Sequence, residues 1–360
     1  MVARITKLVR PVVVAVAFVA CGSSGGTTAP APSDPGSASP PSVHPPTAVA
    51  PLPRPVQPGG NEYDHGPPYP IILMHGMGGF DELQGPIDLT YFYGVIDDLN
   101  AHGENLVFVT TAPPFDTSED RAAALVPQIQ AILEQTHKDK VNLVGHSQGG
   151  MDARVLASPN GLAMGDVIAS VTTIATPHRG SLVADLVLGL LQDVPASTVD
   201  QVSSAFLSLL QKTVYDVQND PQLRAQLIEL SQQYMTSTFN PKYVDAPGVP
   251  YSSYGGRTNL EDGLPDCATD VVYADDPTRL DMAQPEVSAT ATFLQGTTGT
   301  VNDGLVTIAS ARWGTFLQCE PADHLAEVGQ LVQNGPDALS GFDHLAFFRD
   351  VTGRIRAQGL

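Results

Sequence analysis

Short apolar runs recur along the middle of the chain, and helical patterns separate them. The runs at 70–74, 106–110, 141–144 and 171–175 lack polar alternation, which is typical of strands buried on both faces of a parallel sheet. Helical patterns lie between them at 91–102, 118–136 and 151–157. This alternation predicts an α/β fold with a mostly parallel central sheet and helices on both faces.

The alternation ends near residue 181. The segments 182–191, 199–217 and 221–234 read as successive helices with no strand between them. We therefore expect a helical insertion at about 181–240. Two hypotheses stay open, because periodicity alone does not separate them: a hinged lid whose apolar face meets lipid, or a fixed cap whose apolar stripe is ordinary core.

Residues 61–360 are expected to form one large domain. About 300 residues are enough for a substantial core. A late strand is expected at 290–295, and an amphipathic helix at 345–355 ends the domain.

The first sixty residues have a different composition. Basic residues precede an apolar run, 12–20, that is too short to span a bilayer, and Cys21 follows it. This order is similar to a bacterial lipoprotein signal, so 1–21 is expected to be a signal peptide with Cys21 as the lipidation candidate. Phe18 departs from that pattern, so simple secretory cleavage is the alternative. Residues 22–60 are rich in Pro, Ser and Gly and are expected to form a disordered tether.

Charge and cysteine content limit the binding partners and the cellular compartment that the sequence allows. The net charge is −20, with nearly all acids beyond residue 54, which argues against binding to nucleic acid or anionic headgroups. We expect an exported protein, either tethered at the cell surface or outer membrane or secreted. In that setting Cys267 and Cys319 are a disulfide candidate, with two unpaired buried thiols as the alternative. Neither cysteine has a neighbour at zinc-ligand spacing.

The apolar run at 141–144 leads directly into the motif Gly145-His146-Ser147-Gln148-Gly149. A G-x-S-x-G sequence between a buried strand and a helix is the nucleophile-elbow pattern, in which a sharp turn exposes the serine hydroxyl. The glycines are needed because side chains there would collide with neighbouring elements. The motif predicts Ser147 as a nucleophile, and the alternative is an ordinary strand-to-helix turn.

Candidates for the acid and the base lie after residue 300. Asp303 is expected at a turn after the strand at 290–295, and His324 follows it. The order Ser147, Asp303, His324 is that of α/β hydrolases, with His324 as the base and Asp303 holding its tautomer. His344 competes for the role of base, but its position favours the start of the terminal helix. Packing or bracing roles are expected for the other histidines near the motifs, His75, His146 and His178.

Two backbone N–H groups are expected to form an oxyanion hole. The glycine-rich loop after the strand at 70–74 places Met77 as one donor, and Gln148, which follows the nucleophile, supplies the other. The alternative for the first loop is a simple turn from strand to helix.

Taken in order, several motifs resemble those of the secreted bacterial triacylglycerol lipases of the Pseudomonas and Burkholderia type. They lie at 69–77, 141–150, 176–185, 302–306 and 324–331, and include Thr176-Pro177-His178-Arg179-Gly180-Ser181 and Asn302-Asp303-Gly304. The resemblance implies an α/β-hydrolase fold, hydrolysis of lipid esters, the triad and oxyanion donors named above, and a lid from Ser181 onward. It also implies a dedicated membrane foldase as a partner.

The same resemblance raises the question of calcium. Those lipases hold a structural calcium near the catalytic histidine, partly through an aspartate two residues after it, and here that position is Ala326. Gln330 matches a second ligand position, and Asp276 or Asp281 matches the distal acid. Because hard cations need several oxygen ligands, the ligand set that the resemblance implies is incomplete. No cofactor is required for the chemistry.

The sequence thus predicts a serine hydrolase that cleaves carboxylic esters of lipids through an acyl-enzyme. A short-chain carboxylesterase or polyesterase is the alternative within the enzyme class. An inactive, hydrolase-like binding lipoprotein is the alternative from another class, and the complete triad argues against it, because a binding protein has no use for a strained serine.

Overall fold

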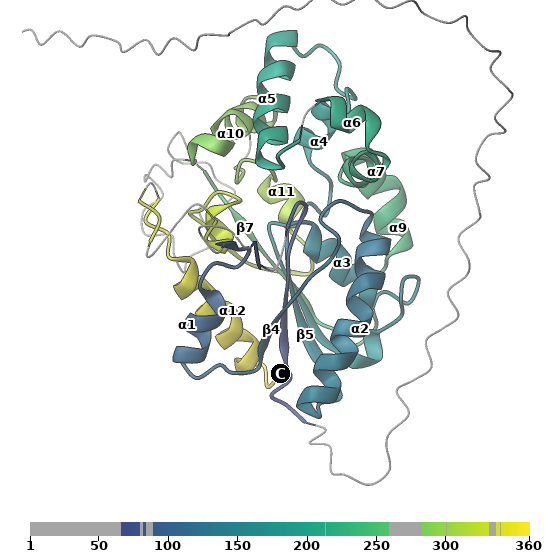
Figure 1. The fold of residues 1–360 in the computed structure, drawn as a ribbon, viewed down its shortest axis with the longest axis vertical. Coiled ribbons are helices and arrows are strands. Elements are labelled where there is room, and N and C mark those ends of the chain that lie inside the picture. Colours follow the sequence, from purple (N-terminus) through teal and green to yellow (C-terminus); the bar gives the residue numbers. More distant parts are fainter. Residues whose placement is uncertain are drawn as a thin grey trace, which may run out of the picture. The chain divides into compact units, whose positions relative to one another are not determined.

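The computed structural model describes residues 66–79, 82–83, 89–212, 214–258, 283–299, 301–330, 336–338 and 340–360, all within the unit Arg54–Leu360 (Figure 1). The expected signal peptide, the lipidation candidate Cys21 and the whole of the expected tether, 22–60, lie outside the described residues. So do Cys267 and the two candidate calcium ligands Asp276 and Asp281. Among the described residues, no helix combines the length and the apolar character needed to cross a membrane.

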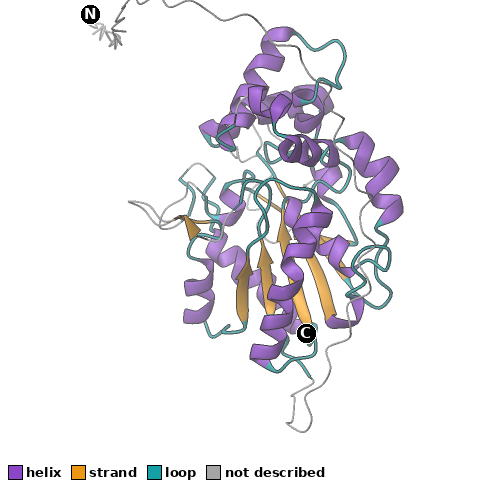
Figure 2. Cartoon of the chain, turned by 45° about the vertical axis from the view of Figure 1, so that its right-hand side comes forward, coloured by secondary structure: helices purple, strands orange, loops and turns teal. Residues whose placement is uncertain are grey.

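A six-stranded parallel sheet in the order β4-β1-β5-β6-β7-β8 forms the centre of the domain (Figure 2). The strands are β1 (Ile71–Met74), β4 (Val107–Thr110), β5 (Val141–His146), β6 (Ile168–Ile174), β7 (Tyr251–Gly256) and β8 (Thr315–Glu320). Every residue of β1, β5 and β6 is buried, as expected for strands covered on both faces. The short strands β2 (Glu82–Leu83) and β3 (Leu89–Thr90) form a separate antiparallel pair. The predicted α/β fold is confirmed.

Helices cover both faces of this sheet (Figure 1). The helices α2 (Ser118–Thr136) and α3 (Gln148–Ala157) pack on one face, and α1 (Val95–Ala101) and α12 (His344–Ala357) pack on the other. Strand β1 shows why: alternate side chains of a strand point to opposite faces, so Ile72 and Met74 join one core and Ile71 and Leu73 join the other.

A helical insertion between β6 and β7 lies beyond the carboxyl ends of the strands (Figures 1 and 2). It consists of α4 (Leu182–Val187), α5 (Ala196–Leu209), α6 (Val214–Asn219), α7 (Pro221–Glu229), α8 (Gln232–Tyr234), a π-helical turn (Met235–Phe239) and α9 (Asn240–Lys242). The expected insertion at about 181–240 is therefore confirmed, although the run at 199–217 is split into α5 and α6. We call α4 to α9 the cap.

The predicted strand at 290–295 is wrong, because these residues belong to the helix α10 (Pro285–Thr298). Its buried side chains Val287, Thr290, Ala291 and Leu294 follow the spacing i, i+3, i+4, i+7 of one helix face. Pro285 starts the helix and Gly299, at φ 64°, ends it.

The strands β7 and β8 take the places in the sheet that the sequence left unassigned. Strand β7 reads Tyr-Ser-Ser-Tyr-Gly-Gly and lacks the β-branched residues that mark a strand. Cys319, on β8, is disulfide-bonded, and its predicted partner Cys267 lies outside the described residues. The pairing of these two cysteines stays a prediction.

Candidate active site

Ser147 occupies a sharp turn between β5 and α3. Its backbone has φ 56° and ψ −129°, a strained conformation for a residue with a side chain. The turn can close because a Cβ at Gly145 would lie 2.4 Å from the Gly150 nitrogen, and one at Gly149 would lie 2.3 Å from the Met74 oxygen. The Thr176 hydroxyl donates to the Ser147 carbonyl at 2.7 Å and holds the turn in place. The predicted elbow geometry is thus present at the predicted serine.

His324 and Asp303 form a buried pair. Nδ1 of His324 lies 2.8 Å from Oδ2 of Asp303, and the other carboxylate oxygen accepts the N–H groups of Leu305 and Val306. The backbone N–H of His324 donates to the Asp303 carbonyl at 2.9 Å. Since Nδ1 faces the carboxylate, Nε2 is left for the cavity, which both His324 and Ser147 line.

The surroundings of Asp303 differ from the expectation of a turn after a strand. Asp303 follows α10 and lies in a loop where Asn302 bridges to Thr307. The loop is nevertheless tied to the sheet edge, because Thr258, just beyond β7, donates its backbone N–H to the Asn302 carbonyl at 2.6 Å. Asp303 thus reaches the carboxyl end of β7 through a tertiary contact and not through its own strand.

The loop after β1 brings Gly76 and Met77 against the serine. A Cβ at Gly76 would lie 2.6 Å from the Ser147 Cβ, and Met77 lines the same cavity. Gln148 begins α3, so its backbone N–H lies at the helix N-terminus beside Ser147. Gln226 of the cap donates to the Gln148 side chain at 2.5 Å, which connects the cap to this residue.

His75 braces this loop, as the sequence predicted. Its Nδ1 donates to the Gly76 carbonyl at 2.9 Å, and the Ala112 N–H donates to its Nε2 at 3.0 Å. Burial, aided by Arg121, lowers the pKa of His75 to about 4, so the ring stays neutral at neutral pH.

Arg121 is a site residue that sequence reasoning missed. Its guanidinium donates to the His75 carbonyl at 2.7 Å and to the Pro113 carbonyl at 2.5 Å, and it pairs with buried Asp152 at 2.9 Å. Arg121 therefore joins the loops after β1 and β4 to helix α3. An arginine on an amphipathic helix normally reads as a solvated residue, so the sequence carried no signal for this role.

The remaining histidines occupy the bracing positions that were expected. His178 lies within hydrogen-bonding distance of the Thr173 hydroxyl at 3.0 Å and stacks on Trp313. His344, the competing candidate for the base, starts α12 and donates through Nε2 to the Tyr93 carbonyl at 2.8 Å. The expectation that His344 begins the terminal helix is confirmed.

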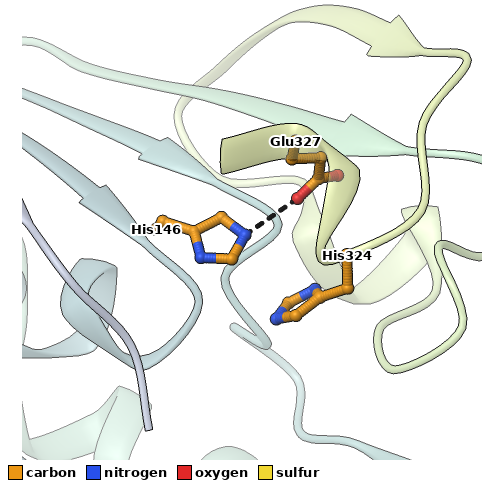
Figure 3. Close-up of side chains that lie close together, drawn as sticks. All are labelled: His146, His324 and Glu327. Carbon is orange, nitrogen blue, oxygen red and sulfur yellow. Dashed lines mark hydrogen bonds and ion pairs between the residues drawn. The ribbon is translucent and has the colours of Figure 1, made fainter. Parts of the chain in front are cut away.

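His146 takes part in a buried network beside His324, and Figure 3 shows its contact with Glu327. Its Nδ1 lies 2.7 Å from the Tyr91 hydroxyl, and its Nε2 lies 3.0 Å from Oε2 of Glu327. The rings of His146 and His324 are 4.6 Å apart between centroids. Burial raises the pKa of Glu327 well above its usual range, with Asp303 adding to the effect, and burial lowers the pKa of His146. We therefore assign both groups as neutral.

The described residues hold only part of the expected calcium ligand set, because the candidate acids Asp276 and Asp281 lie outside them. Ala326 is buried among apolar side chains, and the carboxylate of Asp323 already accepts the N–H groups of Gln284, Leu325 and Ala326. Gln330 lines the substrate cavity. His146, His324 and Glu327 lie within 4.8 Å of one another, but their hydrogen bonds to each other, to Tyr91 and to Asp303 already occupy them.

A cavity of about 130 Å³ opens above Ser147 and His324. Its walls are mostly apolar and come from the loop after β1, the cap and the loop after Asp303. The main apolar contributors are Met77, Phe206, Leu209, Leu210, Leu230 and Leu305. An apolar cavity that ends at a serine–histidine pair fits the acyl part of an ester better than a charged substrate.

Comparison with known proteins shows the family to which this chain belongs. A family model described as the alpha/beta hydrolase fold matches residues 69–253. The triacylglycerol lipase of Vibrio cholerae is 31% identical over 305 residues, which cover 81% of this chain and 89% of that protein. The triacylglycerol lipase of Burkholderia plantarii is 29% identical over 325 residues, covering 81% and 87%. The chain belongs to the α/β hydrolases, within the bacterial triacylglycerol lipase family.

Solved structures agree with the fold of this family. The lipase of Staphylococcus hyicus superposes with a TM-score of 0.54 at 16% identity, covering 83% of this chain and 99% of that chain. Lipase 1 of Pelosinus fermentans gives a TM-score of 0.52 at 17% identity, covering 81% and 98%. The resemblance inferred from the sequence motifs is confirmed.

Proposed function

We propose that this lipase-family protein is a triacylglycerol lipase that cleaves the carboxylic esters of lipids through an acyl-enzyme on Ser147. The observation that carries the proposal is the convergence of the strained Ser147 and the His324–Asp303 pair on one apolar cavity. The family relationship supports the same reaction class, because the relatives are named triacylglycerol lipases.

The proposed mechanism builds on the observed pairing of His324 with Asp303. His324 takes the Ser147 hydroxyl proton through Nε2 as the serine oxygen attacks the ester carbonyl, while Asp303 holds Nδ1–H and stabilises the imidazolium. The N–H groups of Met77 and Gln148 bind the oxyanion, and each such donor is typically worth about 3 kcal/mol. His324 then gives the proton to the leaving alcohol, and water releases the acid by the same steps.

A lipid substrate would enter the cavity past the cap, and the helices of the cap differ in how they are held. Helix α7 is anchored by polar contacts: Gln226 donates to the Pro114 carbonyl at 3.2 Å, and Glu229 accepts the Ser118 N–H at 2.7 Å. Helix α5 packs through apolar side chains instead, and its Phe206 lines the cavity. We therefore assign the movable lid to α5 and the fixed part of the cap to α7.

The surface around the lid supports an encounter with lipid. Three large apolar side chains of the cap are strongly exposed: Leu190 at 51%, Val214 at 54% and Tyr215 at 71%. These side chains flank α5 along the chain, and exposed apolar side chains beside a lid fit a surface that meets an ester interface. The expected export, the lipid anchor at Cys21 and a membrane foldase partner belong to this proposal.

The test compares wild type with Ser147→Ala on p-nitrophenyl esters of increasing chain length and on emulsified triglycerides. Wild type should cleave the emulsions, and the variant should be inactive with an unchanged circular dichroism spectrum. Cleavage of short soluble esters alone would favour the carboxylesterase alternative and a fixed cap. If an organophosphonate fails to label Ser147 in folded protein, the proposal of a hydrolase is wrong, and the result favours the alternative of an inactive binding lipoprotein.

A further inference from the structure

A continuous chain of buried, hydrogen-bonded side chains passes next to His324, and Figure 3 shows its His146–Glu327 part. It runs from the Tyr91 hydroxyl to Nδ1 of His146 at 2.7 Å, and from Nε2 of His146 to Glu327 at 3.0 Å. All three side chains are at most 5% exposed. The reaction as described above uses none of them, so their shared burial needs an explanation.

Each member of the chain belongs to a different part of the catalytic machinery. His146 immediately precedes Ser147 at the end of β5. Glu327 lies three residues after His324, in the 3-10 turn Ala326–Val328. Tyr91 contacts the loop after β1 that carries Gly76 and Met77, because a Cβ at Gly76 would lie 2.9 Å from the Tyr91 hydroxyl oxygen. The chain therefore links the segments that carry the nucleophile, the base and one oxyanion donor.

The contact between the rings of His146 and His324 bears on the tilt of the His324 ring. Asp303 holds the His324 ring at Nδ1, which restrains one edge but leaves the ring free to tilt. The His146 ring lies beside His324 with centroids 4.6 Å apart and planes inclined by 45°. Since His146 is itself held at both nitrogens, it is a rigid wall against such tilting.

We propose that Tyr91, His146 and Glu327 are positioning residues that hold the His324 ring at the angle needed to take the Ser147 proton. This inference rests on the proposed role of His324 as the base. These three residues fix the orientation of the His324 ring and carry no charge. In this arrangement the Glu327 carboxyl O–H donates to Nε2 of His146, and Nδ1–H of His146 donates to the Tyr91 oxygen. Burial is the main cause that keeps the Glu327 carboxyl group protonated, and the neighbouring acids Asp303 and Asp323 add to it.

The central test compares Glu327→Ala with Glu327→Gln. The amide N–H of glutamine can donate to His146 in place of the carboxyl O–H, whereas alanine cannot. Because a misplaced catalytic group typically costs about 10²-fold, we expect Glu327→Ala to lower kcat by about that factor with KM unchanged. Glu327→Gln should keep most of the activity and the same acidic limb of the pH profile, because neither side chain carries a charge.

Glu320→Ala is the matched control. Glu320 is a fully buried carboxyl group in the same acidic cluster, and neither of its oxygens has a hydrogen-bond partner among the described residues. Its removal should leave kcat at the wild-type value. His146→Phe is the second variant: it keeps a ring beside His324 but loses both hydrogen bonds, so a loss of kcat there identifies the hydrogen bonds as the cause.

The readouts are kcat and KM on a soluble p-nitrophenyl ester, the rate of organophosphonate labelling of Ser147, and the melting temperature. A kcat of Glu327→Ala equal to that of Glu320→Ala overturns the proposal, and so does a Glu327→Gln variant as slow as Glu327→Ala. If Glu327→Ala does not fold, His146→Phe and Tyr91→Phe decide between the same outcomes.

The labelling rate separates this inference from the proposed function. If wild type is labelled by the phosphonate but cleaves no lipid ester, the proposed substrate is wrong, and the variants still test the positioning chain through their labelling rates. If wild type is not labelled at all, the role of His324 as a base fails, and the inference fails with it.

Discussion

Gly76 is the position at which one added methyl group should do most damage to catalysis. The replacement Gly76→Ala places a Cβ 2.6 Å from the Ser147 Cβ, 2.9 Å from the Tyr91 hydroxyl and 3.1 Å from the Ser147 Oγ. Two of these contacts are to Ser147 and the third is to Tyr91, so the new methyl group does not fit without movement. The loop after β1, the serine or both must move.

The size of the effect follows from the required movement. Ordinary contacts of a Cβ begin near 3.4 Å, so the Ser147 and Gly76 segments must separate by about 0.8 Å. Displacement of a catalytic group by about 1 Å typically costs about 10²-fold in rate. Overpacking of this kind also costs about 1–3 kcal/mol of stability. We expect kcat for Gly76→Ala to fall by about 10²-fold, with a modest fall in melting temperature.

Gly296→Ala is the control. Gly296 lies inside helix α10, and a Cβ there would meet nothing within 4 Å. Since alanine favours a helix interior over glycine by about 1 kcal/mol, this variant should keep full activity and melt slightly higher. Both variants are assayed on a p-nitrophenyl ester and by thermal melting. Wild-type kcat in a folded Gly76→Ala variant would refute the tight approach of this loop to the serine.

Three further predictions concern the base, the cap and calcium. His324→Ala should lose orders of magnitude in kcat while His344→Ala, whose ring contacts the Tyr93 carbonyl, should keep it; the reverse result in ester assays would exchange the two assignments. Burial raises the pKa of Glu229 from 4.5 to about 7, so the folded protein keeps a proton that the unfolded chain loses, and stability should fall as pH rises between these values. The free energy of unfolding of Glu229→Gln should therefore equal that of wild type at about pH 4 and exceed it by about 3 kcal/mol at about pH 8, as followed by thermal melts. A difference that stays constant across this pH range would contradict the prediction. Because the side chain of Ala326 offers no oxygen, we expect a chelator to change neither activity nor melting temperature. A loss of either that added calcium restores would prove this wrong.

Much of the site could be predicted because it depends on local sequence. The elbow needs a buried strand, a glycine two residues before and two residues after the serine, and a helix, and all of these are adjacent along the chain. The order of Ser147, Asp303 and His324 and the two oxyanion positions follow from the same architecture. The structure brings Asp303 and His324 together at 2.8 Å, as the sequence predicted.

The errors have identifiable physical causes. The segment at 290–295 was predicted to be a strand, and only the packing of one face of α10, through Val287, Ala291 and Leu294, shows that the helical period prevails. Strand β7 was missed because its serines and glycines lack a strand pattern, and its pairing with β6 makes it a strand.

The sequence by itself determined the fold class and led to the residues proposed for the chemistry, because these depend on periodicity and on short motifs. Only the tertiary structure decided the roles of Arg121, Tyr91 and Glu327, since each acts through contacts with segments distant in the chain. It also separated the cap into the anchored α7 and the apolar α5. A buried charged or polar residue is stable only where distant partners meet it, and no local pattern of the sequence records that meeting.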